Sequence, residues 1–229
     1  IGTIHPLNKI GKICKAKKIL FHTDASQALG KLNFNVKDLN IDLASFSSHK
    51  IYGPKGIGAI YLKKELDLRI VPLLSGGGQE NGLRSGTLPT ALCSAFGHAI
   101  ELVVKEKNKN VKKIKQLKKT FLQTLKKTKV NYFLNGKNVV DHNINITFPD
   151  IDGYYLFSKL NDISLSSGSA CGSGSGETSY VLKEIGLNKI YAKSTLRIGI
   201  GKDNTKNDLI YCASRISKIM QKFLIEKKI

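Results

Sequence analysis

The sequence predicts an α/β fold in two parts. Two apolar runs of strand type within the first 50 residues each end in polar residues, and strand-like and helix-like segments alternate beyond residue 130. Hydrophobic residues make up 41% of the 229 residues, which is enough to build a substantial core. We expect an incomplete large domain over residues 1–105 and a small C-terminal α/β domain over residues 106–229.

The first domain is expected to begin with an amphipathic helix. Apolar residues recur at helical spacing over residues 4–18, which places Ile10, Ile13 and Cys14 on one face and lysines on the other. The segments expected after it are a strand over 19–27, an irregular connection over 31–40, strands over 42–46 and 58–62, and a glycine-dense loop over 75–90.

A long amphipathic stretch joins the two domains. Its apolar residues keep helical spacing from residue 91 to about 127, and we expect two helices with a break near Asn108 to Asn110. Beyond it we expect strands over 132–134, 143–148, 163–166 and 195–200, and helices over 153–161, 179–185 and 204–226.

The charge of the chain is strongly basic, with a formal net charge of +20. The excess is nearly all lysine, and it comes with many Asn and Ile residues, as in an AT-rich coding sequence. Because arginine is the usual reader of bases, we predict a solvated basic face without specific nucleic-acid binding. The alternative is a basic protein that binds polyanions nonspecifically.

The start of the sequence and the cysteines indicate in which compartment the protein is expected. No apolar run is long enough to span a membrane, and the start at Ile1 has neither a methionine nor the pattern of a signal peptide, so we expect part of a larger product. The four cysteines lack metal-motif spacing and fit a reducing compartment, either cytoplasm or an organelle matrix. Cys93 and Cys212 lie in apolar helical patterns, which predicts packing roles.

Two ionisable residues lie at the ends of successive predicted strands. Asp24 ends the first and Lys50 follows the second, and open α/β sheets place their sites at strand ends. Pyridoxal phosphate needs a lysine for its aldehyde and an acid for its pyridinium nitrogen, so this pair suits that cofactor. The alternatives are a surface lysine and an aspartate that caps a helix or a turn.

A second pair of candidates lies in the C-terminal half. Cys171 stands within a Gly/Ser segment over residues 167–177, where a tethered thiol could attack at one place and deliver at another. Arg197 lies in an apolar strand and invites a bidentate carboxylate partner. The alternatives are a free cysteine in a linker and an ordinary salt bridge.

These motifs resemble those of one enzyme family. The segments His22-Thr23-Asp24-Ala25-Ser26-Gln27 and Ser47-Ser48-His49-Lys50-Ile51-Tyr52-Gly53-Pro54-Lys55-Gly56 closely resemble the cofactor segments of cysteine desulfurases, which are class-V aminotransferase-like enzymes. Segments 84–89, 166–171 and 194–199 follow the family pattern in the family order. The resemblance implies a fold-type-I transferase dependent on pyridoxal 5'-phosphate, which takes sulfur from L-cysteine for iron–sulfur cluster assembly.

The resemblance also implies a role for each candidate residue. Lys50 would bind the cofactor as a Schiff base, Asp24 would hold its ring nitrogen, and Gln27 would bind its ring oxygen. Cys171 would take the substrate sulfur as a persulfide, pass it to a scaffold or other acceptor protein, and share a metal cluster with that scaffold. The residues implied for the phosphate and the substrate carboxylate are Ser47, Ser48, His49, Thr87 from the other subunit of a homodimer, and Arg197.

Other interpretations stay open. Thr87 would also suit the N-cap of a helix that starts near Leu88. The chain could be a non-catalytic remnant or partner subunit of a desulfurase, because a full-length member carries pocket residues in a part before Ile1, and we expect poor activity from the chain alone. A selenocysteine lyase is a further alternative.

Overall fold

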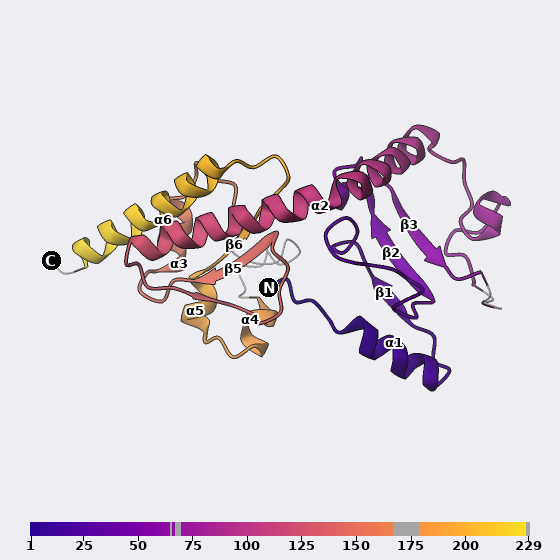
Figure 1. The fold of residues 1–229 in the computed structure, drawn as a ribbon, viewed down its shortest axis with the longest axis horizontal. Coiled ribbons are helices and arrows are strands. Elements are labelled where there is room, and N and C mark those ends of the chain that lie inside the picture. The colour runs from indigo at the N-terminus through magenta and orange to yellow at the C-terminus, as the bar shows by residue number, and fades with distance from the viewer. Residues whose placement is uncertain (65, 67–69, 167–178, 228–229) are drawn as a thin grey trace. The chain divides into compact units, whose positions relative to one another are not determined.

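The computed structural model describes residues 1–64, 66, 70–166 and 179–227. The chain forms two compact units (Figure 1): one is Pro6–Asn108, and the other combines Ile1–His5 with Lys109–Ile229. We call them the N-terminal unit and the C-terminal unit and describe each by itself. The domain division at residue 105 stays a prediction.

The N-terminal unit is built on a three-stranded sheet in the order β1-β2-β3 (Figure 1). Strands β1 (His22–Asp24) and β2 (Leu43–Ser47) are parallel, and β3 (Gly58–Leu62) is antiparallel to β2. Asp24 is in register with Ser45 of β2. Because parallel strands share the direction of their carboxyl ends, the residues that follow β1 and β2 emerge at the same edge of the sheet.

Two small cores hold this sheet and its connections. The first packs α1 (Leu7–Ala16) through Ile10 and Cys14 onto buried residues of the sheet region, whereas Ile13, expected on the same face of the helix, is 56% exposed. Ile13 lies one residue before Cys14, about 100° away around the helix axis, and this ten-residue helix buries only a narrow stripe. The second core contains Ile51, Phe96, Ala99 and Val103, with Leu29 packed against them.

Helix α2 (Thr90–Lys127) is continuous over 38 residues, so the predicted break near Asn108 to Asn110 was wrong. Asparagine is only a weak helix former, at a penalty of about 0.7 kcal/mol or less per residue, and no glycine or proline stands there to stop the helix. The carbonyl of Pro89 accepts a hydrogen bond from the N–H of Cys93 (3.0 Å), which makes Pro89 the N-cap. Thr87 is therefore not the N-cap of this helix.

The C-terminal unit packs helices on a second three-stranded sheet. Its strands β4 (Phe133–Leu134), β5 (Asn143–Thr147) and β6 (Thr195–Gly199) are antiparallel in that order. The second half of α2 and the closing helix α6 (Lys206–Glu226) pack with β5 and β6 around fully buried Phe121 and Phe148. The short helices are α3 (Gly153–Ser158), α4 (Tyr180–Glu184) and α5 (Lys189–Lys193).

Two predictions for this unit need correction. The strand expected over residues 163–166 is reduced to a single bridge between Ser166 and Arg197, and the helix α5 was not expected. Asn188 caps α5 by accepting a hydrogen bond from the N–H of Tyr191 (2.8 Å), and Asn is a favoured N-cap residue. The signal was therefore present, but the helix has only five residues, too few to show a helical period.

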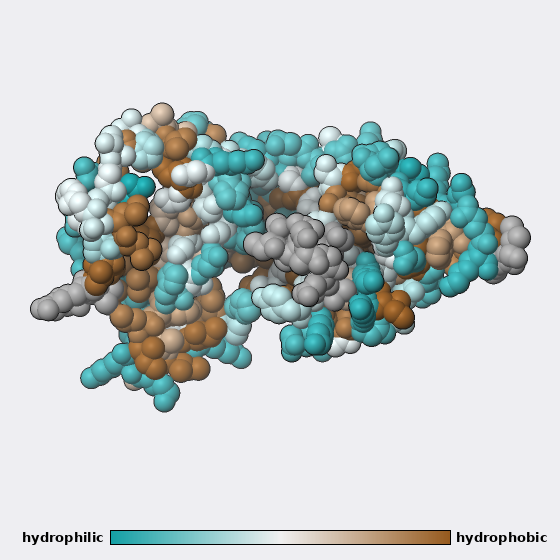
Figure 2. Space-filling view, turned by 180° about the vertical axis from the view of Figure 1, so that it is seen from behind, coloured by the Kyte–Doolittle hydropathy of each residue, from teal (hydrophilic) through white to brown (hydrophobic). Residues whose placement is uncertain are grey.

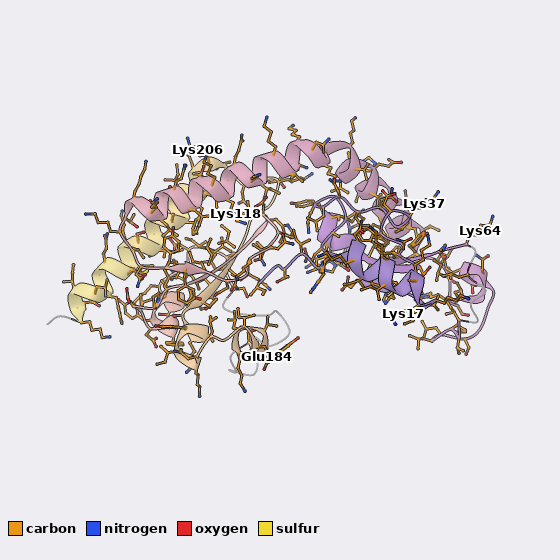
Figure 3. The ribbon with its side chains drawn as sticks, turned by 60° about the horizontal axis from the view of Figure 1, so that its bottom comes forward. Lys17, Lys37, Lys64, Lys118, Glu184 and Lys206 are labelled. Atoms are coloured by element: carbon orange, nitrogen blue, oxygen red, sulfur yellow. The ribbon has the colours of Figure 1, made fainter. Side chains whose placement is uncertain are left out.

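The surface carries both apolar and basic side chains. Figure 2 shows apolar residues exposed on the N-terminal unit, where Val71 and Leu73 are 84% and 100% exposed. Lysines such as Lys17 and Lys37 project from the surface (Figure 3). Within the described part of the chain, no helix combines the length and the apolar character needed to cross a bilayer.

Candidate functional site

Asp24 lies at the end of β1, in a turn that holds its carboxylate. Its Oδ1 accepts a hydrogen bond from the backbone N–H of Ser26 (2.8 Å). Hydrogen bonds from the Ser26 side chain and then from the Ser26 backbone lower the pKa of Asp24, with smaller contributions from the charges of His22 and Lys50. The carboxylate is thus kept ionised at neutral pH, which is the state that can pair with a protonated ring nitrogen.

Lys50 lies in a short 3₁₀ helix, Ser48–Ile51, directly after β2. Its side chain is exposed, while the next residue, Ile51, is buried in the second core and fixes the turn. Tyr52 ends the turn in the left-handed region with a φ of 68°. The structure therefore brings Lys50 to the same edge of the sheet as Asp24, near enough for its charge to act on that carboxylate.

The two serines before Lys50 differ in environment. Ser47 Oγ lies 3.0 Å from His49 Nδ1 in an exposed pair, so both side chains are open to a ligand. Ser48 is fully buried, and its hydroxyl has no hydrogen-bond partner among the described residues. A Cβ added to Gly53 would lie 2.2 Å from Ser48 Oγ, so this hydroxyl packs beneath the Gly53 loop. Its predicted role as a phosphate ligand stays a prediction.

Gln27 follows β1 in the same turn as Asp24, and its Oε1 accepts a hydrogen bond from Lys31 Nζ (2.9 Å). Burial, together with the charge of Lys50, lowers the pKa of Lys31 to about 8. Lys31 did not appear among the sequence candidates. Lys31 follows Gln27 by four residues, a spacing that allows a side-chain contact. In a lysine-rich chain, that spacing alone does not distinguish Lys31 from the other lysines.

Thr87 is exposed, and the loop that contains it is stabilised by hydrogen bonds between its own residues. Arg84 Nη1 donates to the carbonyl of Ser85 (2.7 Å), and Ser85 Oγ donates to the carbonyl of Gly77 (2.8 Å). The N–H of Gly86 donates to Gln79 Oε1 (3.2 Å). The loop thus presents Thr87 to the outside, and its role as a ligand in another subunit stays a prediction.

Arg197 belongs to the C-terminal unit, on β6, where it is half-buried. Its backbone pairs with Ser166 in both directions, at 2.7 and 3.3 Å. Arg197 and Lys50 lie in different units. Cys171 lies outside the described residues, so its predicted catalytic and metal-ligand roles stay predictions. Among the described residues, no group of acidic, histidine or cysteine side chains is arranged to bind a metal ion.

The cysteines that the structure describes have different environments. Cys212 is buried in the main core of the C-terminal unit, and burial raises its pKa to about 12, which confirms its packing role. Cys93 is exposed, so its predicted packing role was wrong. It lies on the first turn of α2.

Comparison with known proteins decides the family. Residues 1–211 match the class-V aminotransferase family. The chain belongs to this family. It is 44% identical over 222 residues to the cysteine desulfurase IscS of Rickettsia typhi, covering 96% of this chain and 54% of that protein. It is also 44% identical to the mitosomal cysteine desulfurase of Encephalitozoon cuniculi, covering 97% of this chain and 52% of that protein. The chain thus spans about half the length of the curated relatives it matches.

A solved structure agrees with this assignment. A NifS-like protein from Rickettsia africae superposes with a TM-score of 0.84 at 32% identity, over 96% of this chain and 59% of that chain. The predicted α/β fold and the resemblance to cysteine desulfurases are therefore confirmed.

Proposed function

We propose that this class-V family chain carries the cofactor-binding and sulfur-transfer residues of a cysteine desulfurase. The observation that carries the proposal is the pair of Asp24 and Lys50 at one edge of the sheet, an ionised carboxylate beside an exposed amine. This donor set fits pyridoxal 5'-phosphate, which needs a lysine and an anionic partner for its ring nitrogen.

Each residue of the proposed cofactor site has its own role. Pyridoxal phosphate, when bound, supplies an electron sink for chemistry at the substrate's α-carbon. Lys50 would hold the cofactor covalently, and Asp24 would keep the proton on its ring nitrogen. Gln27 would donate to its ring oxygen, and the exposed pair of Ser47 and His49 would bind its phosphate.

Sulfur transfer is assigned to residues of the C-terminal unit. Arg197 would bind the carboxylate of L-cysteine as a bidentate pair. The thiolate of Cys171 would form a bond to the substrate sulfur while the substrate's carbon–sulfur bond breaks. L-Alanine leaves after protonation of that carbon, and a persulfide stays on Cys171 for transfer to an iron–sulfur scaffold or another acceptor thiol.

The cofactor assignment is tested by chemical trapping. The 229-residue chain is incubated with pyridoxal phosphate, reduced with borohydride, digested and mapped by mass spectrometry. We expect the pyridoxyl group on Lys50 and its loss in Lys50→Ala. Lys55→Ala, which alters a lysine of the same segment, is the matched control. Label that persists in Lys50→Ala and maps to Lys55 would contradict the assignment.

The sulfur assignment is tested separately. Cys171→Ser should keep cofactor binding, since binding needs no thiol, but should lose persulfide labelling and sulfide release. Cys93→Ser is the control, because Cys93 is the exposed cysteine of the described residues. Persulfide found on Cys93 in the unaltered chain would remove Cys171 from the proposal.

The proposal includes a homodimer in a reducing compartment, cytoplasm or organelle matrix. The exposed loop of Thr87 and exposed apolar residues such as Leu73 support a subunit interface on the N-terminal unit. With the N-terminal half of a related desulfurase supplied, mixing Thr87→Ala chains with Lys50→Ala chains should restore one site per mixed dimer, provided that each variant alone is inactive. Absence of recovery would argue that Thr87 serves its own subunit.

A second candidate is a non-catalytic portion of such an enzyme. It is favoured by the finding that the chain spans about half the length of its relatives. Measuring alanine production from L-cysteine by the 229-residue chain, with and without the N-terminal half of a related desulfurase, separates the two. Absence of activity even with the added half supports the candidate, and activity with the added half or without it excludes the candidate.

A further inference from the structure

A lysine outside the predicted motifs contacts the candidate cofactor site. Lys31 Nζ donates a hydrogen bond to Gln27 Oε1 at 2.9 Å, one turn of chain beyond Gln27. Lys31 is half-buried, and this burial together with the positive charge of Lys50 lowers the pKa of Lys31 to about 8. At neutral pH Lys31 therefore carries an ammonium group that donates to the Gln27 carboxamide.

The backbone holds Lys31 in this position. The preceding Gly30 has a φ of 70°, and a Cβ added there would lie 2.3 Å from Val103 Cγ2 of α2. Leu29 packs against the same core that contains Ile51, the residue after Lys50. One core therefore anchors the chain beside both lysines, and the exposed side-chain contact between Lys31 and Gln27 forms on this anchored segment.

The chemistry of the pair fixes the orientation of the amide. An ammonium group has three donors and no acceptor, so only the oxygen of a carboxamide can face it. The Oε1 of Gln27 is therefore committed to Lys31, and the Nε2 group remains free to donate to another partner. A cofactor's ring oxygen is an acceptor, and it requires a donor of this kind.

We propose that Lys31 is a positioning residue, which holds the Gln27 carboxamide so that Nε2 is the group offered to the ring oxygen of pyridoxal phosphate. The identity of the ligand rests on the proposed function, while the geometry of the pair does not. A neutral amine can accept a hydrogen bond, so deprotonation of Lys31 frees the amide to turn. The charged groups around this edge are Lys50, which acts on Lys31, and Asp24, which interacts with Lys50 and His22.

The first test uses no cofactor. In the ¹⁵N-labelled 229-residue chain, the side-chain amide signals of Gln27, assigned with Gln27→Ala, should shift with a midpoint at a pH of about 8. Lys31→Met should abolish this titration, and Lys31→Arg should remove the midpoint but keep the neutral-pH positions, because arginine stays charged. Lys37→Met, at an exposed lysine nearby in sequence, should change neither. A midpoint that survives Lys31→Met, or signals that never move, would overturn the proposal.

The second test measures cofactor binding at neutral pH by absorbance titration. Lys31→Met should bind pyridoxal phosphate roughly fivefold to tenfold more weakly, the equivalent of about one hydrogen bond. Lys31→Arg should recover most of the affinity, and Lys37→Met should match the unaltered chain. If the unaltered chain binds no cofactor, the proposed function and this ligand assignment fail together, whatever the amide signals show. If it binds and Lys31→Met binds equally well, the role of Lys31 alone is refuted.

Discussion

Replacing Ser48 with alanine should make the protein more stable. The Ser48 side chain is fully buried, and its Oγ has no hydrogen-bond partner among the described residues. A buried polar group without a partner costs about 1–3 kcal/mol of desolvation, and alanine keeps the Cβ while removing the hydroxyl. After allowing for lost packing contacts of Oγ, we expect the free energy of unfolding to rise by about 1–2 kcal/mol. Urea denaturation followed by circular dichroism measures the change as a higher midpoint at constant slope.

A double-mutant cycle tests the geometry behind this expectation. A Cβ at Gly53 would lie 2.2 Å from Ser48 Oγ and 3.1 Å from the Cβ of Ala99. Gly53→Ala alone should therefore destabilise by about 1–3 kcal/mol, and much of that loss should vanish in the Ser48→Ala background. Ser47→Ala, at an exposed hydroxyl, should stay within about 0.5 kcal/mol. Destabilisation by Ser48→Ala, additive effects in the cycle, or cofactor binding weakened as much as by Ser47→Ala would refute the reasoning.

Three further predictions follow from burial. Phe121→Ala should lower the free energy of unfolding by about 3–5 kcal/mol in urea denaturation, because Phe121 is fully buried, and a smaller loss would show that the core of the C-terminal unit closes around the gap. Gly30→Ala should cost about 1–3 kcal/mol, since its Cβ would lie 2.3 Å from Val103 Cγ2 at a positive φ, and a neutral result would mean that this close approach is absent. Iodoacetamide should modify Cys93 but not Cys212 in the folded protein at neutral pH, because burial raises the pKa of Cys212 to about 12, and equal labelling would contradict that burial.

Strand ends were the part of the site that the sequence could predict. The apolar run after the Pro/Gly loop placed β3 at its observed bounds, and the change from apolar to polar residues marked the ends of β1 and β2, near which Asp24 and Lys50 lie. The parallel pairing of β1 with β2 depends on contacts between distant residues, which no local pattern encodes. From the sequence, the placement of Asp24 and Lys50 at one edge of the sheet was an expectation based on the fold class. The observed parallel register of β1 with β2 establishes it.

Burial of individual residues was harder to predict than the elements that carry them. Ser47 and Ser48 are neighbours of one residue type, yet the turn from β2 into a 3₁₀ helix leaves Ser47 partly exposed and buries Ser48. The contact of Lys31 with Gln27 depends on a left-handed turn at Gly30, which fits beneath Val103 from a helix more than 70 residues later. Packing between distant segments decides such details, and local propensity carries little of that information.

The distribution of candidates between the two units allows cofactor binding and sulfur transfer to be separated. Asp24, Gln27 and Lys50 all lie in the N-terminal unit, which has its own cores, while Arg197 lies on a strand of the C-terminal unit's separate core. A substitution that disturbs only the core around Arg197 should leave cofactor binding intact, because no residue of the proposed cofactor site packs in that core. A variant that loses turnover but keeps the bound cofactor therefore points to substrate recognition or sulfur transfer. A variant that loses both points to the edge of the sheet at which Asp24 and Lys50 lie.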